Sequence, residues 1–356
     1  MYYCDTYAYE NPSMRTRVCI TIDTEFSIAG AFAASNRRPV AEPMVWCNVD
    51  GRSEGLGFML DCFASHNITA TFFVEALHRY YFKDDPMRPI VERIRTRGHE
   101  IQLHAHPCWS VFQHEDWQER VRQTPRQDDF FGRPEDDSVR LIEYGLAVFR
   151  DWGLPAPQVF RSGSLQHDDL LYRALARTGI PYSSNIGQAI FDSGDPHYKL
   201  YSGRHLRHGV LECPVLTFSD WSVPGKRHLK SLTITGTSFA ETRSLLDEAQ
   251  RAGIGQVVVL THPFEYVQSH DDTLAHARRH RLNQKRLAQL CQYVDQQRDR
   301  FLPSGIAEAA SEPLRREDGD NRLLTGSAWL SVRRLASQTA YHQYGKWALT
   351  RTQVSQ

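Results

Sequence analysis

The sequence predicts an α/β protein whose parallel strands close into a barrel. Short β-branched apolar runs alternate with amphipathic, helix-like segments about seven times along the chain. Some of these runs, such as QVVVL at residues 256–260, are apolar throughout, as strands buried on both faces are. The chain has 356 residues, a length that favours a closed barrel over an open, doubly wound sheet.

The elements are expected in the following order. Strands are predicted at residues 17–23, 68–75, 100–106, 158–161, 182–185, 229–235, 256–260 and 301–304, with a hairpin within 198–218. Helices are predicted at residues 55–65, 89–97, 138–152, 168–178, 239–252 and 274–300. Residues 27–50 lack a period and are expected to form a long loop. Residues 110–137 are expected to form an excursion, as a plain surface loop or as a lid beside the site.

The chain is expected to divide into three parts. Residues 1–16 are an irregular leader, residues 17–310 form the barrel, and residues 311–356 are a linker and a tail. A candidate helix at 328–349 in the tail mixes tryptophan and aliphatic residues with arginine and lysine. Such a helix can lie on a membrane surface or pack against the barrel, and packing is the interpretation we favour.

Composition excludes several classes of partner. Lys plus Arg equals Asp plus Glu at 42 each, so we expect no nucleic-acid partner and a small or neutral substrate. The seven cysteines form no CxxC pair, and no signal peptide or membrane-spanning segment is recognisable. We therefore expect a protein of the reducing cytoplasm, with peripheral contact at the inner membrane face through the tail as an alternative.

The strand ends carry the candidate chemistry, because barrel enzymes place their working residues at the carboxyl ends of strands. His104 and His106 end one predicted strand and face the same way, as ligands of one divalent metal would. No Gly-rich phosphate loop follows the first strand, which disfavours nucleotide binding. The strand-end residues together form the inventory of a metallohydrolase: Asp23, Glu25, His104, His106, Arg161, His262 and Glu265.

These segments resemble, in order, the motifs of the polysaccharide deacetylases, a family of metal-dependent carbohydrate esterases. ITIDTEF occupies the place of the aspartate motif, and TATFFVE follows as the second strand. GHEIQLHAHP occupies the histidine motif, FRSGS the arginine motif and VVVLTHP the late Leu-x-His motif. The resemblance covers about residues 17–263 and implies a deformed (β/α)7 barrel.

The resemblance also implies roles for individual residues. Asp23 matches the general base that acts on the attacking water, and Arg161 matches the arginine that orients that base. His104 matches the first metal-binding histidine, and His262 matches the acid that protonates the leaving amine.

The chain departs from the family pattern at two positions. Thr24 replaces the second aspartate of the first motif, so we assign Glu25 as the carboxylate ligand, with Asp23 as the rival. The usual family spacing would place the second ligand histidine at Cys108, and we favour His106, two residues before it.

The expected function is removal of an N-acetyl or O-acetyl group from a sugar or a lipid-linked glycan precursor, with a bound divalent metal. Zn²⁺ is the first expectation, and Co²⁺ or Ni²⁺ are alternatives. Competing hypotheses are an amidase or ureide hydrolase, a glycosidase with two carboxylates, and a glycan-binding pseudoenzyme. Trp46, Trp109 and Trp221 are candidates to stack on a sugar ring, with ordinary packing as the alternative.

Overall fold

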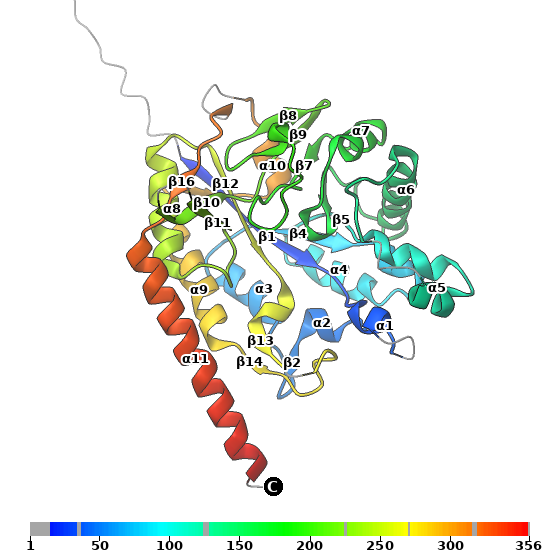
Figure 1. Cartoon of the computed structure of the whole chain (residues 1–356), viewed down its shortest axis with the longest axis horizontal. Helices are drawn as coiled ribbons and strands as arrows, with labels where there is room; N and C mark the ends of the chain where they lie inside the picture. Colours follow the sequence, from blue (N-terminus) through cyan, green and yellow to red (C-terminus); the bar gives the residue numbers. More distant parts are fainter. Residues whose placement is uncertain are drawn as a thin grey trace, which may run out of the picture.

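The computed structural model describes residues 15–33, 37–123, 128–223, 226–269, 271–314 and 319–354. Its main sheet consists of β1 (Thr16–Thr24), β4 (Thr71–Glu75), β5 (Glu100–Ala105), β6 (Val159–Ser162), β7 (Tyr182–Ser183), β8 (His205–Arg207), β9 (Val210–Glu212), β12 (Gln256–Thr261) and β15 (Phe301–Pro303). The strand order is β12-β1-β4-β5-β6-β7-β9-β8, and β15 pairs with β1 beside it (Figure 1).

This sheet curls into a barrel. Every neighbouring pair from β12 to β9 is parallel, and the β8–β9 hairpin is antiparallel. After β9, Val215 forms a parallel bridge to Val258 of β12, and Thr233 forms another to Leu260 of the same strand. The seven strands β12, β1, β4, β5, β6, β7 and β9 therefore close on themselves through short bridges. This confirms the predicted deformed (β/α)7 barrel.

Helices cover the outside of the barrel, as Figure 1 shows. They are α3 (Leu56–Ser65), α4 (Met87–Thr96), α6 (Glu135–Asp151), α7 (Asp169–Arg177), α8 (Phe239–Arg251) and α9 (Arg281–Gln296). The alternation of β1 separates two cores: Ile20 and Ile22 pack in the large outer cluster, whereas Cys19 lies in an inner one. The short helix α10 (Ile306–Ser311) contributes to the inner cluster. Asp23 shares the alternation of Cys19 and therefore faces inward.

Local sequence signals fix several helix ends. Ser238 and Glu241 form a capping box at the start of α8, and the Asp168 carboxylate accepts a hydrogen bond from the backbone N–H of Leu171 in α7. Gly98 follows α4 with a φ of 76°, a left-handed conformation that glycine adopts without strain. These signals explain why the predicted bounds of those helices lie within a few residues of the observed ones.

Two predicted irregular segments contain ordered elements. Residues 27–50 hold α1 (Ala29–Ala33), α2 (Pro43–Trp46) and β2 (Asn48–Val49), which pairs with β3 (Arg52–Ser53). The predicted loop is wrong there, because elements this short show no hydrophobic period. A 3-10 helix at Pro107–Gln113 reaches into the 110–137 excursion, which also contains α5 (Trp117–Gln123).

The region after β12 also differs from the prediction. Strand β13 (Val267–Gln268) pairs antiparallel with β14 (Arg278–Arg279), so the helix predicted at 274–300 is wrong at its start. His280 accepts a hydrogen bond from the backbone N–H of Asn283, and this cap begins α9 at Arg281. Of the strand predicted at 229–235, only the first part lies in β11 (Lys226–Ser231), which pairs with β10 (Thr217–Val223).

The tail is helical and packs on the barrel. After β16 (Leu324–Thr325), α11 (Ala328–Val354) runs along α8 and α9 toward β14 (Figure 1). Arg334 and Ser331 contact the barrel from one face, whereas Trp329 on the opposite face is 67% exposed. Within the described residues, no helix has both the length and the apolar character needed to cross a membrane. Of the predicted leader 1–16, residues 1–14 lie outside the described residues, and the boundaries at 16 and 310 stay predictions.

Candidate metal centre

The six predicted site residues lie at one end of the barrel because the strands that carry them run parallel and in register. His104 of β5 stands between Glu75 of β4 and Arg161 of β6. On the other side of β4, Ile22 of β1 pairs with Thr261 of β12. The carboxyl ends of these strands therefore meet at one edge, together with the residues that follow them. These are the side chains brought together: Asp23, Glu25, His104, His106, Arg161 and His262.

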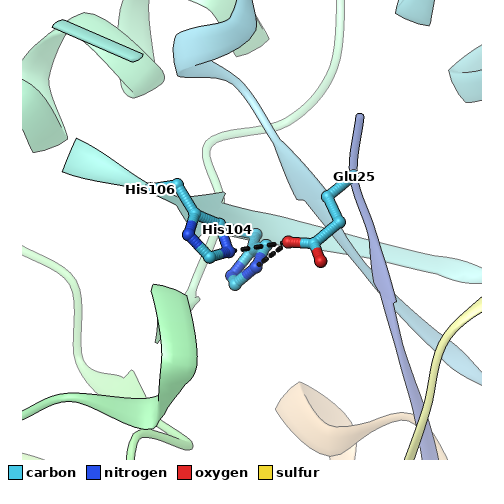
Figure 2. A group of neighbouring side chains, drawn as sticks. All are labelled: Glu25, His104 and His106. Atoms are coloured by element: carbon cyan, nitrogen blue, oxygen red, sulfur yellow. Dashed lines mark hydrogen bonds and ion pairs between the residues drawn. The ribbon is translucent and has the colours of Figure 1, made fainter. Parts of the chain in front are cut away.

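Glu25, His104 and His106 form the centre of this site. The Oε2 atom of Glu25 lies 2.7 Å from Nε2 of His106 and 3.1 Å from Nε2 of His104. Figure 2 shows both rings directed at the same carboxylate. Each residue offers one atom to a metal ion, and these atoms all lie within 4.8 Å of one another. His104 is buried, and Glu25 and His106 are half-buried.

The far sides of both imidazole rings already have partners. Nδ1 of His104 donates to the backbone carbonyl of Arg161 at 2.8 Å, and Nδ1 of His106 lies 2.8 Å from Oδ2 of Asp128. These partners assign the Nδ1–H tautomer, so each neutral ring presents its Nε2 lone pair to Glu25. Two lone pairs and a carboxylate oxygen can share one small space only with a cation or protons between them. The donor set therefore fits a divalent metal, and the outer partners are those that metal-binding histidines usually have.

The charges in the cluster also favour binding of a cation. Burial opposes ionisation of Glu25, but the neighbouring His106 and His104 lower the pKa of its carboxyl well below the usual value. Burial likewise disfavours the imidazolium of His106, yet Glu25 and Asp128 raise the pKa of this ring well above the usual value. The cluster thus attracts positive charge, and a metal ion satisfies this demand without a proton.

Asp23 is held by Arg161 beside the cluster. Nη1 of Arg161 donates to Oδ1 of Asp23 and to the hydroxyl of Thr21, both at 2.8 Å. The guanidinium is fully buried, lies 4.1 Å from the ring centre of Phe73, and also donates to the backbone carbonyl and the hydroxyl of Ser184. These contacts fix the orientation of one carboxylate oxygen of Asp23 and leave the other toward the site.

That second oxygen faces His262. Nε2 of His262 lies 3.9 Å from Oδ2 of Asp23, while Nδ1 lies 3.1 Å from Oε1 of Glu265. The ring stacks on Phe264 with a centroid separation of 5.0 Å. Burial lowers the pKa of this imidazole, but Glu265 and Asp23 outweigh it and raise the pKa to about 9. His262 therefore carries a proton at neutral pH and can donate it.

Neither of the two rival ligands is a member of this cluster. Among the described residues, neither Asp23 nor Cys108 belongs to a metal-sized group with Glu25 and His104. Cys108 groups instead with Asp128 and His106, on the Nδ1 side of that ring. The geometry therefore supports Glu25 and His106 as ligands over Asp23 and Cys108.

A cavity of about 180 Å³ opens beside the cluster. Its walls include both site residues and apolar side chains: Glu25, Phe26, Ser27, Ile28, Met44, His106, Trp109 and Phe264. Trp109 is almost fully buried against Phe82 and Phe112, and Trp221 stacks on His228. Stacking of a sugar on Trp46, Trp109 or Trp221 stays a prediction.

Three residues that contact His106 were not predicted from the sequence. Asp128 lies in the excursion at 110–137, where no spacing rule links it to His106. Glu75 accepts hydrogen bonds from the backbone N–H groups of Leu77 and His78 at 2.7 Å and from that of His106 at 3.4 Å. Gly163 approaches His106 so closely that a Cβ atom there would lie 2.4 Å from Nδ1 of the ring. Its place in the FRSGS motif is the one signal that could have pointed to this contact.

No family model and no curated protein matches the chain. Similar solved structures include a Mycobacterium smegmatis protein described as a polysaccharide deacetylase, with 15% identity and a TM-score of 0.46 over 85% of this chain and 91% of that one. A peptidoglycan N-acetylglucosamine deacetylase has 14% identity and a TM-score of 0.42 over 86% and 92% of the two chains. A CE4 family pseudoenzyme from Bacillus anthracis has 11% identity and a TM-score of 0.40 over 84% and 67%.

Polysaccharide deacetylases are thus among the structures similar to this chain, as its motifs predict. The similarity is distant, so the fold is established by the chain's own strand order and register. The site roles depend on the geometry of this chain alone.

Proposed function

We propose that this protein is a metal-dependent hydrolase that removes an acetyl group, most simply an N-acetyl group, from a sugar or a lipid-linked glycan precursor. The observation that carries the proposal is the convergence of Nε2 of His104, Nε2 of His106 and a carboxylate oxygen of Glu25, beside Asp23 and His262. A carboxylate base and a protonated imidazole at the edge of a metal-sized cluster suit hydrolysis of an acyl group.

In this proposal Glu25, His104 and His106 hold the metal, with Zn²⁺ as the first expectation and Co²⁺ or Ni²⁺ as alternatives. When bound there, the ion supplies Lewis acidity that makes water more acidic and polarises the acyl carbonyl. Asp128 and the backbone carbonyl of Arg161 keep both rings in the tautomer that binds metal.

The remaining residues move protons. Asp23, fixed by Arg161, accepts a proton from the attacking water while the oxygen of that water bonds to the acyl carbon. His262 donates its Nε2 proton to the leaving nitrogen as the carbon–nitrogen bond breaks, because an amine leaves poorly without a proton. The products are acetate and the amine. An O-acetyl substrate would need the same residues, with an alcohol as the leaving group.

The test is acetate release by the full chain after removal of metal and reloading with Zn²⁺, Co²⁺ or Ni²⁺. Substrates are N-acetylated amino sugars in neutral, nucleotide-linked and lipid-linked forms. We expect release only from the reloaded protein, and loss of both metal and activity in Glu25→Gln. Glu42→Gln is the matched control, since Glu42 is an exposed carboxylate on the same segment after β1.

A different outcome of the same experiment would contradict the proposal. A folded protein that binds none of the three metals and releases no acetate from any substrate would show that the hydrolase proposal is wrong. It would favour the glycan-binding pseudoenzyme hypothesis.

A further inference from the structure

The small cavity beside Glu25 has walls that are mostly apolar. Among the eight described residues that line it, five carry apolar side chains: Phe26, Ile28, Met44, Trp109 and Phe264. The other three are Ser27 and the two proposed metal ligands Glu25 and His106. We call this space the apolar cavity. Its position directly against two ligands raises the question of which part of a substrate it would hold.

Phe26 and Trp109 form a fixed part of the wall. Phe26 is 4% exposed, and its ring meets those of His78 and Phe82 edge-on, with centroid separations of 5.0 and 5.5 Å. Trp109 is 1% exposed and packs on Phe82 and Phe112. Because these rings hold one another in place, this part of the wall needs no ligand to form, as is usual for binding pockets.

Met44 and Phe264 form a second part of the wall, and both are half-buried. Met44 lies on α2, which follows α1 beyond the end of β1 (Figure 1). This helix contacts the 3-10 helix Pro263–Tyr266, which carries Phe264. Methionine is unbranched and polarisable, so its side chain adapts to the shape of an apolar ligand. The second part of the wall is therefore the one that can adjust to what enters.

The apolar cavity offers few hydrogen bonds. The backbone N–H and carbonyl groups of Ser27 are both paired with Val40, at 2.9 and 2.8 Å. Apart from the two proposed ligands, the only polar side chain among the lining residues is the hydroxyl of Ser27. A sugar ring placed here would leave most of its hydroxyl groups without partners, which costs more free energy than apolar contact returns. An apolar group fits these walls better.

The apolar cavity borders the metal centre on the side away from the proton donor. Glu25 and His106 line it, whereas Asp23 and His262 do not. In the proposed reaction the leaving nitrogen lies within reach of Nε2 of His262, and the acyl carbon lies at the metal centre. The chain on the acyl carbon points away from that nitrogen. The apolar cavity is therefore placed to receive the acyl chain, and not the sugar.

The size of the apolar cavity exceeds what an acetyl group needs. Its volume is about 180 Å³. An apolar protein cavity of about 150 Å³ holds a benzene molecule, whereas a methyl group is close in size to one water, whose share of liquid volume is about 30 Å³. The methyl group of an acetyl substrate would leave most of the apolar cavity to water. A chain of about six carbons would fill it.

We propose that the acyl group that this protein removes is longer than acetyl, with a chain of about four to six carbons that binds in the apolar cavity. This inference depends on the proposed function and changes only the acyl group of its substrate. The oxygen of the attacking water bonds to the acyl carbon, the carbon–nitrogen bond breaks, and His262 gives its proton to the nitrogen. The products are a short-chain carboxylate and the free amine.

The first test compares N-acetyl, N-butyryl and N-hexanoyl glucosamine as substrates of the full chain loaded with Zn²⁺. Each methylene that leaves water should raise kcat/KM about two- to fourfold. The hexanoyl substrate should therefore exceed the acetyl one by at least about tenfold, chiefly through a lower KM, because the chain is bound before the transition state as well as in it. Hydrolysis of the acetyl substrate with no gain from a longer chain would overturn the inference and leave the proposed function intact.

The second test measures binding without turnover. Titration calorimetry compares hexanamide with acetamide, two neutral amides that need no metal to enter an apolar space. Hexanamide should bind at least about tenfold more tightly. Hexanamide binding by a protein that hydrolyses no N-acyl sugar would refute the proposed function. Hydrolysis of acetylated sugar without preferential binding of hexanamide would refute only the inference about the acyl group.

A variant that narrows the apolar cavity tests where the chain lies. In Met44→Trp, the ratio of kcat/KM for the hexanoyl over the acetyl substrate should fall about tenfold, because the larger side chain takes the space of the acyl chain. Leu206→Trp is the matched control, since Leu206 of β8 is 59% exposed and lies outside the lining, and it should keep the ratio of the parent.

Met44→Ala changes the same wall in the opposite direction and serves if the tryptophan variant does not fold. The enlarged cavity should shift the preference toward N-octanoyl glucosamine relative to the hexanoyl substrate. An unchanged preference in a folded Met44 variant would contradict the assignment of the apolar cavity to the acyl chain.

Discussion

Two clusters of ionisable side chains, one half-buried at the mouth of the barrel and one buried beneath α11, balance their charges in different ways. Beneath α11, Arg334 pairs with both Asp220 and Glu241 at 3.2 Å, and Ser331 donates to Glu241. All four of these residues, which we call the α11 anchor, are at most 4% exposed. At the barrel mouth, the only described ion-pair partners of Glu25 are the rings of His104 and His106.

The difference indicates which cluster is structural and which is functional. A buried carboxylate needs positive charge or hydrogen-bond donors, and in the α11 anchor the Arg334 guanidinium supplies a permanent charge to two carboxylates, of which Asp220 also pairs with His228. Glu25 faces imidazoles whose charge depends on protonation, so its cluster can take its positive charge from an added cation instead. Substitutions in the two clusters should therefore affect different properties: stability beneath α11, metal binding and turnover at the barrel mouth.

The largest expected effect is on turnover, in Asp23→Asn. An amide cannot take the proton of the attacking water, so kcat should fall about 10³-fold. The metal content should stay that of the parent, because Asp23 lies outside the cluster of Glu25 and the two histidines. Elemental analysis beside acetate-release kinetics measures both. Loss of the metal in this variant would instead make Asp23 a ligand.

The next largest effect is on stability, in Arg334→Met. This change leaves Asp220 and Glu241 buried without their guanidinium partner and should lower the free energy of unfolding by about 3 kcal/mol in urea titrations. Arg333→Met is the control at the preceding residue, which is exposed, and should change stability by less than about 0.5 kcal/mol. If both variants unfold alike, the α11 anchor does not hold the tail.

The two clusters also differ in how far their residues could be predicted from the sequence. Strand-end residues such as His104 and Arg161 were predictable, because period-2 alternation and parallel pairing place them at one edge of the sheet. The arrangement of Asp128 beside His106 was not, since it depends on how an aperiodic segment folds back over β5. The α11 anchor joins Asp220 to Arg334 across more than a hundred residues, and no local pattern connects them.

The predicted start of the helix at 274–300 is wrong for a related reason. The sequence predicts a helix from residue 274, whereas Arg278 and Arg279 pair with β13 through a tertiary contact and the helix begins at Arg281. Pairing of two-residue strands contributes too little local signal to outweigh helical spacing. Tertiary contacts, and not propensity, decide such segments.

A smaller effect should follow from Asp128→Asn. Loss of the carboxylate that holds Nδ1 of His106 should weaken metal affinity about ten- to a hundredfold, while Glu25 and both rings remain as ligands. Asp129→Asn is the control, because Asp129 is the exposed neighbour of a buried carboxylate. Competition with a chromogenic chelator measures the affinity. Unchanged affinity in Asp128→Asn would mean that the excursion does not support the metal centre.

The smallest expected effect concerns the pH dependence of turnover. With a pKa of about 9, His262 is protonated at neutral pH, so kcat should fall as the pH rises through that region. Glu265 is the main source of the raised pKa, and Glu265→Gln should therefore move the alkaline limb to lower pH by about one unit. The comparison uses equal metal loading, because a bound cation also lowers the pKa of a nearby imidazole. A limb that stays in place would show that another group titrates there, and that His262 is not the acid.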